Sequence, residues 1–189
     1  MIKVFIGGSR NITMLNKDIK GRIDNIIQKE YTVLIGDANG ADKSVQKYLF
    51  DKSYKNVRVF CMGNEYRNNV GHWETKHIKG TWDKKDYYYY SIKDLEMARE
   101  TDYGFMIWDG KSKGTLNNII NLLKENKKVL VYFSPNKEFY NLISFNDLEK
   151  LLAKCEKKFL ETFEEKFKVS QILKKEQQLQ QEFNFPLKV

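Results

Sequence analysis

The stretch Val33-Leu34-Ile35-Gly36-Asp37-Ala38-Asn39-Gly40-Ala41-Asp42 leads from a short apolar run through a glycine turn into a segment with helical spacing. The same order occurs twice more. Val4–Ile6 leads into Gly7-Gly8-Ser9-Arg10, and Phe105–Trp108 leads into Asp109-Gly110-Lys111-Ser112-Lys113-Gly114-Thr115. Open α/β sheets bind ligands beyond the carboxyl ends of their strands, where glycine lets backbone N–H groups approach an anion. Three such turns predict one phosphate-bearing ligand held by several loops.

Apolar runs of strand length alternate with segments whose apolar residues recur at helical spacing. This alternation is typical of a parallel sheet with helices on both faces, and continuous apolar strands fit a sheet buried on both sides. We therefore expect an α/β fold with a Rossmann-like open parallel sheet of about five strands. The expected strands are Ile2–Ile6, Thr32–Ile35, Val57–Cys61, Tyr103–Trp108 and Val129–Phe133. Helices are expected between residues 14 and 30 and from 41 to about 51. A short helix that includes residues 95–98 is expected to stop before Asp102, and another is marked by the apolar residues between Leu116 and Leu123.

Two regions depart from this alternation. Residues 63–90 form a long polar segment rich in aromatic side chains, including Trp73 and Trp82. We interpret it either as a cover for a bound ligand or as a surface unit that packs its own aromatics. From about Phe145 an apolar stripe at three- and four-residue steps predicts one or two helices. The expected domains are residues 1–143, with an insertion at about 63–90, and a C-terminal helical extension over 144–189.

The composition gives a formal charge of +8, from 33 Lys and Arg against 25 Asp and Glu. This excess favours acidic partners such as nucleotides, although dispersed lysines are more typical of a solvated surface. Cys61 and Cys155 form no CxxC pattern, and His72 and His77 have no ligand cluster nearby, so we expect no metal and no cofactor. Cys61 ends an apolar run and is expected to be buried. The lack of a long apolar run or signal-peptide pattern favours a cytoplasmic protein without a membrane segment.

The third turn contains Gly110-Lys111-Ser112, which is similar to the end of a P-loop. A P-loop also requires glycine five residues before Gly110, and that position is Phe105, which excludes a P-loop NTPase. Ser112, Gly114 and Thr115 can still offer backbone and hydroxyl donors to a phosphate at the positive end of a helix. The alternative is a tight turn in which the threonine caps the helix.

The other two turns carry candidates for ribose and phosphate binding. Asp37 or Asp42 could accept a hydrogen bond from a ribose hydroxyl; alternatively, Asp37 is a turn former and Asp42 a charge at a helix start. The GxGxxG dinucleotide fingerprint is absent. Arg10 follows the first strand and suits bidentate phosphate binding, and the alternative for this residue is a surface position in a loop.

Three motifs in this order resemble those of the SLOG superfamily: Gly8-Ser9-Arg10, the Gly36–Asp42 turn and the Asp109–Thr115 turn. Its members include lonely-guy phosphoribohydrolases and DNA-processing protein A, and the closest resemblance is to its small bacterial and phage branch. The resemblance covers about residues 1–133. It implies a Rossmann-like fold and a nucleotide or nucleotide-derived ligand, and it says nothing about the C-terminal extension.

The chain departs from the hydrolytic members of this superfamily at one position. Lonely-guy enzymes carry Pro-Gly-Gly-x-Gly-Thr-x-x-Glu, and the resemblance assigns the glycosidic chemistry to that Glu. Aligned on Gly114-Thr115, the position is Asn118. An amide cannot act as a carboxylate base or nucleophile, so whether this chain is an enzyme stays open. Another carboxylate could take the role, and the sequence singles out none of Asp37, Glu65, Glu74 and Asp109.

Three functions are compatible with the sequence. The first is a sensor or sequestering module that binds an NAD-, ADP-ribose- or nucleoside-phosphate-like ligand, with Asn64, Arg67 and Trp73 closing over it. The second is a nucleotide N-glycosidase of the phosphoribohydrolase type, and the third a DNA- or RNA-binding protein. We also expect a homo-oligomer. The residues expected to bind the ligand are Gly8, Ser9, Arg10, Gly36, Asp37, Asn39, Gly40, Asp42, Asn64, Arg67, Asp109, Gly110, Ser112, Gly114 and Thr115.

Overall fold

The computed structural model describes residues 1–79 and 87–183, in which a seven-stranded sheet has the order β4-β3-β2-β1-β5-β6-β7. Neighbouring strands are parallel except for β6 and β7, which are antiparallel. The strands are β1 Lys3–Gly8, β2 Thr32–Gly36, β3 Val57–Met62, β4 Glu74–Ile78, β5 Tyr103–Trp108, β6 Lys128–Phe133 and β7 Glu138–Leu142. The helices are α1 Lys17–Gln28, α2 Ala41–Asp51, α3 Tyr87–Glu100, α4 Lys113–Lys124, α5 Phe145–Leu152, α6 Lys157–Phe167 and α7 Val169–Phe183.

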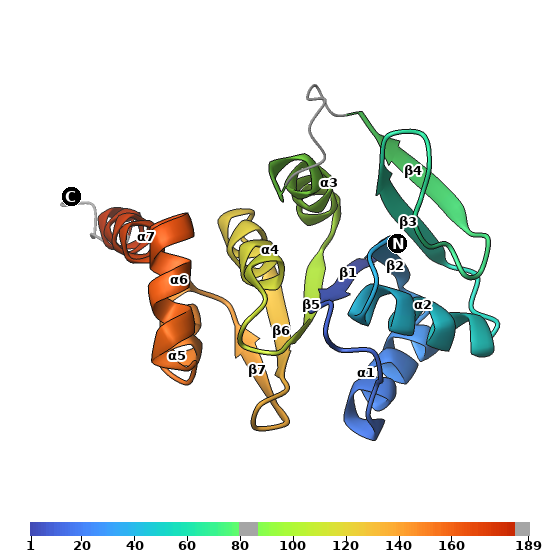
Figure 1. The fold of residues 1–189 in the computed structure, drawn as a ribbon, viewed down its shortest axis with the longest axis horizontal. Coiled ribbons are helices and arrows are strands. Elements are labelled where there is room, and N and C mark those ends of the chain that lie inside the picture. The colour runs from blue at the N-terminus through green and yellow to red at the C-terminus, as the bar shows by residue number, and fades with distance from the viewer. Residues whose placement is uncertain (80–86, 184–189) are drawn as a thin grey trace, which may run out of the picture.

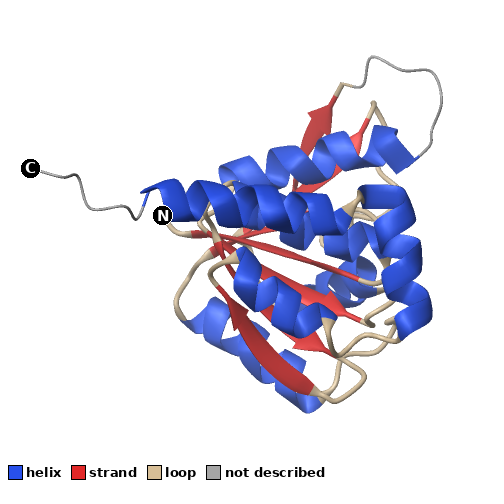
Figure 2. Ribbon diagram, turned by 90° about the vertical axis from the view of Figure 1, so that its left-hand side faces the viewer, coloured by secondary structure: helices blue, strands red, loops and turns tan. Residues whose placement is uncertain are grey.

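Helices cover both faces of the sheet (Figures 1 and 2). On one face, α1 and α2 bury Ile23 and Val45 in an apolar cluster with strand residues such as Ile35. On the other face, α3 and α4 share a second cluster with α5, α6 and α7. Alternate strand residues enter the two clusters, because successive side chains of a strand point to opposite sides. The expected α/β class with a Rossmann-like open sheet is therefore confirmed.

Two edge strands have no counterpart among the five predicted ones. β4 lies within the insertion and has no fully buried residue, and β7 has only one. An edge strand that faces solvent carries polar side chains, so neither segment shows the apolar run by which the inner strands are recognised. β7 follows β6 through a short turn and therefore runs antiparallel, which the prediction of a purely parallel sheet did not include.

Two helical predictions are wrong in extent. The helix expected at 95–98 is the fourteen-residue α3, which begins inside the tyrosine run of the insertion. The extension holds α5, α6 and α7 rather than one or two helices, because Lys168 takes a left-handed conformation (φ 49°) between the last two. Phe163 of α6 is buried against Trp108 of β5, with ring centroids 6.1 Å apart, so the extension packs on the sheet domain. Among the described residues, no helix has the length and apolar character needed to cross a membrane.

Candidate functional site

A crevice of about 570 Å³ opens at the carboxyl ends of the central strands. β1 and β5 are neighbours, but the chain leaves β1 toward β2 and returns to β5 only after β4 and α3. This reversal of strand order is the topological switch point at which open α/β sheets bind ligands. The crevice is lined by residues from the loop after β1, the start of α2, α3, the first turns of α4, and Lys166 of α6.

Ser9 joins the loops that follow β1 and β5. Its side chain is buried, and its hydroxyl donates to Oδ1 of Asp109 at 2.9 Å and accepts from the Asp109 backbone N–H at 3.0 Å. The same Asp109 oxygen accepts from the backbone N–H groups of Lys111 and Ser112. Ser9 and Asp109 therefore fix the shape of the two loops around the crevice.

Gly40 brings the loop after β2 against the loop after β1. Its φ is 83°, and a Cβ added there would lie 2.2 Å from the carbonyl oxygen of Arg10. Only glycine combines this left-handed conformation with so close an approach. The next residue, Ala41, donates its N–H to the carbonyl oxygen of Ser9 at 3.2 Å. The three turns expected to lie together are thus held in contact.

The first turn of α4 faces the crevice with the positive end of its dipole. Ser112 is the N-cap, and its hydroxyl accepts from the N–H of Thr115 at 3.3 Å and from the Thr115 hydroxyl at 3.0 Å. The alternative in which the threonine caps the helix is therefore wrong. The N–H groups of Lys113 and Gly114 occupy the first two helical positions, where a helix offers no acceptor of its own. Space beside Gly114 is open, since an added Cβ there would have no neighbour within 4 Å.

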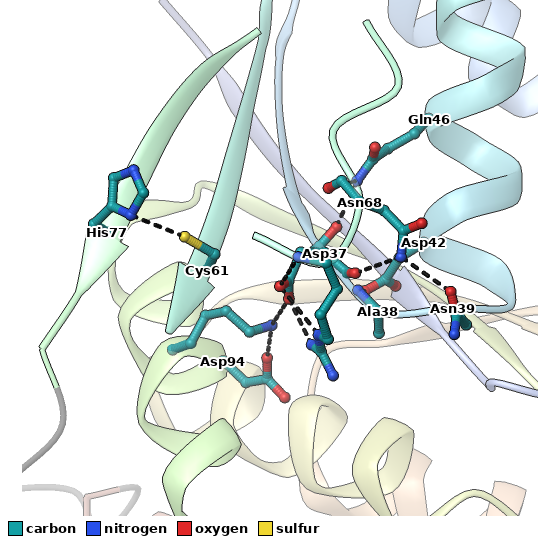
Figure 3. Close-up of polar contacts among 12 residues, drawn as sticks. Asp37, Ala38, Asn39, Asp42, Gln46, Cys61, Asn68, His77 and Asp94 are labelled. Atoms are coloured by element: carbon teal, nitrogen blue, oxygen red, sulfur yellow. Dashed lines mark hydrogen bonds and ion pairs between the residues drawn. The ribbon is translucent and has the colours of Figure 1, made fainter. Parts of the chain in front are cut away.

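Charged side chains gather in and beside the crevice lining, and Figure 3 shows the polar contacts of Asp37, Asp42 and Asp94. Nζ of Lys93 lies 2.8 Å from Oδ1 of Asp94 and 4.0 Å from Oδ1 of Asp37. Asp42 accepts from the backbone N–H of Ala38 at 3.3 Å. Burial raises the pKa of Asp42 to about 7, against the opposing charge of Lys93. Burial alone would lower the pKa of Lys93, but the nearby carboxylates of Asp94 and Asp42 raise it above its ordinary value.

Asp37 anchors the insertion to the edge of the sheet. Its Oδ2 accepts from the backbone N–H and from Nε of Arg67, each at 3.1 Å, and its Oδ1 accepts from a terminal nitrogen of that guanidinium at 2.5 Å. Although burial raises the pKa of Asp37, the hydrogen bonds from Arg67 and the charge of Lys93 bring it below its ordinary value. The Arg67 guanidinium also lies 4.5 Å from the ring centroid of Tyr90.

Asn118 lies in α4 beside the carboxylate of Asp94. With its amide nitrogen turned toward the two acceptors, it donates to Oδ2 of Asp94 and to the carbonyl oxygen of Gly114, each at 3.2 Å. The amide of Asn118 therefore lies next to a carboxylate from α3.

The structure brings together about half of the predicted ligand-binding residues. Those that line the crevice are Gly8, Arg10, Asp42, Arg67, Ser112, Gly114 and Thr115. Those outside its lining are Ser9, Gly36, Asp37, Asn39, Gly40, Asn64, Asp109 and Gly110. Of the second group, Asn39 accepts from the side chain of Asn68 at 3.0 Å, and Asn64 is exposed after β3.

The most prominent residues missed from the sequence are Lys93 and Asp94 of α3, which line the crevice together with Tyr90. Tyr90, Lys93 and Met97 recur at three- and four-residue steps, so they share one face of the helix. A lysine on the same face as the buried Met97 is the signal that could have indicated a charged site. Also missed were the cations at the mouth of the crevice: Lys111, Lys113 and Lys166.

Other candidate residues lie away from the crevice. Trp73 packs against the α1 and α2 cluster and donates its ring N–H to the carbonyl oxygen of Tyr54 at 2.9 Å, so it does not close over this site. Trp82 lies outside the described residues. Cys61 is buried, as expected, with its Sγ 3.2 Å from Nδ1 of His77. Within 1–79 and 87–183 there is no group of three or more His, Cys, Asp or Glu residues that could hold a metal ion.

Comparison of the chain with protein-family models gave no match, and a search of curated protein sequences gave none either.

Proposed function

We propose that this protein binds a nucleotide or a nucleotide-derived ligand in the crevice between β1 and β5. The observation that carries the proposal is the convergence of positive groups on one cavity at the switch point. Six cationic side chains line the crevice against two carboxylates, those of Asp42 and Asp94. The cationic residues are Arg10, Arg67, Lys93, Lys111, Lys113 and Lys166. Such an excess next to a helix N-terminus favours a phosphate.

The phosphate is expected at the first turn of α4, where Lys113 and Gly114 line the crevice and their N–H groups have no acceptor within the helix. Arg10 and Lys111 line the same mouth and add charge there. Lys111 also reaches the extension, with its Nζ 3.3 Å from Glu156 of the chain preceding α6. The mouth of the site therefore involves residues of the sheet domain and of the extension.

The part of the crevice that is lined by Asp42, Asp94 and Tyr90 suits a sugar and a base. Asp42 and Asp94 can accept hydrogen bonds from ribose hydroxyls. Tyr90, with the Arg67 guanidinium against its ring, offers an aromatic surface for a base. A volume of about 570 Å³ lies within the range of small-molecule sites. The resemblance to the SLOG superfamily supports the same class of ligand, in a cytoplasmic sensor or sequestering role.

The proposal is tested by thermal unfolding of the full chain with nucleoside monophosphates, ADP-ribose, NAD and cyclic nucleotides. A ligand at a hundred times its Kd stabilises the folded state by about 2.7 kcal/mol, which raises Tm by roughly 5–10 °C for a chain of this size. We expect at least one member of the panel to do so, and added salt to weaken the effect.

Lys113→Ala should reduce this stabilisation, whereas Lys124→Ala, in the last turn of the same helix, should leave it unchanged. Equal effects of the two substitutions, or a panel in which no member raises the Tm of the wild type, would contradict the proposal. The expectations of a homo-oligomer and of a nucleic-acid partner stay predictions.

A further inference from the structure

We propose that a second site, a groove at the amino ends of β5 and β6, binds an aliphatic carboxylic acid. The groove has a volume of about 350 Å³ and lies at the opposite end of the strands from the crevice. Val4, near the start of β1, lines the groove, whereas Gly7 and Gly8 at the end of the same strand line the crevice. This site is therefore independent of the nucleotide binding proposed above.

The groove is open because the chain places no further helix over this part of the sheet. β6 turns directly into β7, without the crossover helix that another parallel strand would require (Figure 1). On this face of the sheet, the described helices that contribute buried apolar residues are α1 and α2. Ile26, near the end of α1, lines the groove. The amino ends of β5 and β6 are therefore covered only in part.

Apolar side chains of the groove stay accessible as a result. Phe105 of β5 and Leu130 of β6 are register partners, and Leu130 is half-buried where Phe105 is buried. Tyr103, at the start of β5, is 42% exposed, and Ile143, directly after β7, is 69% exposed. All four residues line the groove. An accessible apolar groove with a volume in the range of small-molecule sites favours an apolar ligand.

The charged residues of the groove favour an anionic head group on that ligand. Arg22 and Lys128 line the groove, and no carboxylate of the described residues does. The Arg22 guanidinium lies 5.9 Å from the ring centroid of Phe139, so it is directed toward the sheet. Asp102, just before β5, accepts from the backbone N–H of Lys3 at 2.8 Å and does not line the groove. A guanidinium and an ammonium can form charge-assisted hydrogen bonds with a ligand carboxylate.

The same charges disfavour a second copy of this chain as the occupant. A two-fold contact through the groove would place Arg22 and Lys128 of each copy near the like charges of the other. In the part of the chain that the structure describes, neither residue forms an ion pair with a carboxylate that could offset this repulsion. An aliphatic acid fits both features, because its chain covers the apolar residues while its carboxylate reaches the two cations.

The test is titration calorimetry and thermal unfolding of the full chain with decanoate, and with decanol and decylamine, which keep the chain and change the head group. We expect decanoate to bind and to raise Tm. Decanol and decylamine should bind at least about tenfold more weakly, because each loses the charged hydrogen bonds. The double variant Arg22→Ala, Lys128→Ala should weaken decanoate binding at least about tenfold. Lys20→Ala, also exposed on α1 but outside the groove, is the matched control and should bind decanoate as the wild type does.

Ile143→Asp adds a negative charge at an exposed position of the groove and should abolish decanoate binding, and its Tm without ligand shows that the variant is folded. Met14→Asp makes the same change at an 85% exposed residue outside the groove and should leave binding unchanged. The proposal is overturned if decanoate does not bind, or if decanoate, decanol and decylamine bind equally well. A dimer in solution that Ile143→Asp dissociates and decanoate does not would assign the groove to a second copy instead.

Discussion

Replacing Gly36 by alanine tests whether the side chains of Asp42 and Lys93 are packed as tightly as their distances from Gly36 imply. A Cβ at this position would lie 2.5 Å from Oδ2 of Asp42 and 2.8 Å from Nζ of Lys93, well inside van der Waals contact. The Lys93 side chain is only 4% exposed, so it cannot move into solvent without leaving its partner Asp94. Adding a methyl group to a packed interior typically costs about 1–3 kcal/mol.

We therefore expect Gly36→Ala to lower the urea midpoint with little change in m, and to lower Tm by roughly 2–12 °C. Gly21→Ala is the matched control, because Gly21 lies on an exposed position of α1 where an added Cβ meets nothing within 4 Å. That change should stabilise the fold by about 0.5–1 kcal/mol. Gly36→Ala should also weaken the ligand-induced rise in Tm. A Gly36→Ala protein as stable as the wild type, with unchanged ligand response, would refute this account of the site.

Three further substitutions test separate parts of the structure. Because the folded state raises the pKa of Asp42, the contribution of this residue to stability falls as pH increases from about 4 to 7. Urea titrations over this range should therefore show the free energy of unfolding of Asp42→Asn rising relative to that of the wild type. Arg67→Ala leaves the carboxylate of Asp37, which is 3% exposed, without its main partner and should lower the free energy of unfolding by about 2–3 kcal/mol. Arg67→Lys should recover part of the resulting loss in urea midpoint. Phe163→Ala removes a buried ring from beside Trp108 and should lower the free energy of unfolding by about 3–5 kcal/mol. If the unfolding transition followed by tryptophan fluorescence stays as in the wild type, the extension does not stabilise the sheet.

The inner strands could be predicted because burial on both faces leaves a continuous apolar run in the sequence. β5 was predicted to the residue, and β1 and β2 within about two residues at each end. The edge strands β4 and β7 could not be predicted this way, because a strand with a solvated side has no such run. The start of α3 was missed for a related reason, since a run of tyrosines fits a surface loop as well as a helix.

The residues of the candidate site also divide into those that a local sequence pattern predicts and those that it does not. Gly8 is the last residue of β1, and Ser112, Gly114 and Thr115 lie in the turn after β5 and the first turn of α4, so a local pattern was enough to predict that they lie together at the crevice. The contribution of α3 depends on a return from β4 to β5, a long-range feature of the topology that no short motif encodes. Ser9 and Asp109, which were also predicted to bind the ligand, hydrogen-bond to each other in the structure and do not line the crevice. A pattern of polar residues at a turn therefore does not separate side chains that line a crevice from side chains that hold the loops around it.

The cost of the buried cluster is itself an argument for function. Ionised groups taken out of water lose hydration that their pairing seldom restores in full, and apolar replacements of similar size are often neutral or stabilising. The two large clusters between the sheet and its helices consist of apolar side chains. The charged side chains buried among the described residues are Asp37, Asp42 and Lys93, and Gly36 leaves room for the last two. Because packing alone would favour an apolar residue at position 93, a ligand that uses the charge is the simplest physical reason for a lysine there.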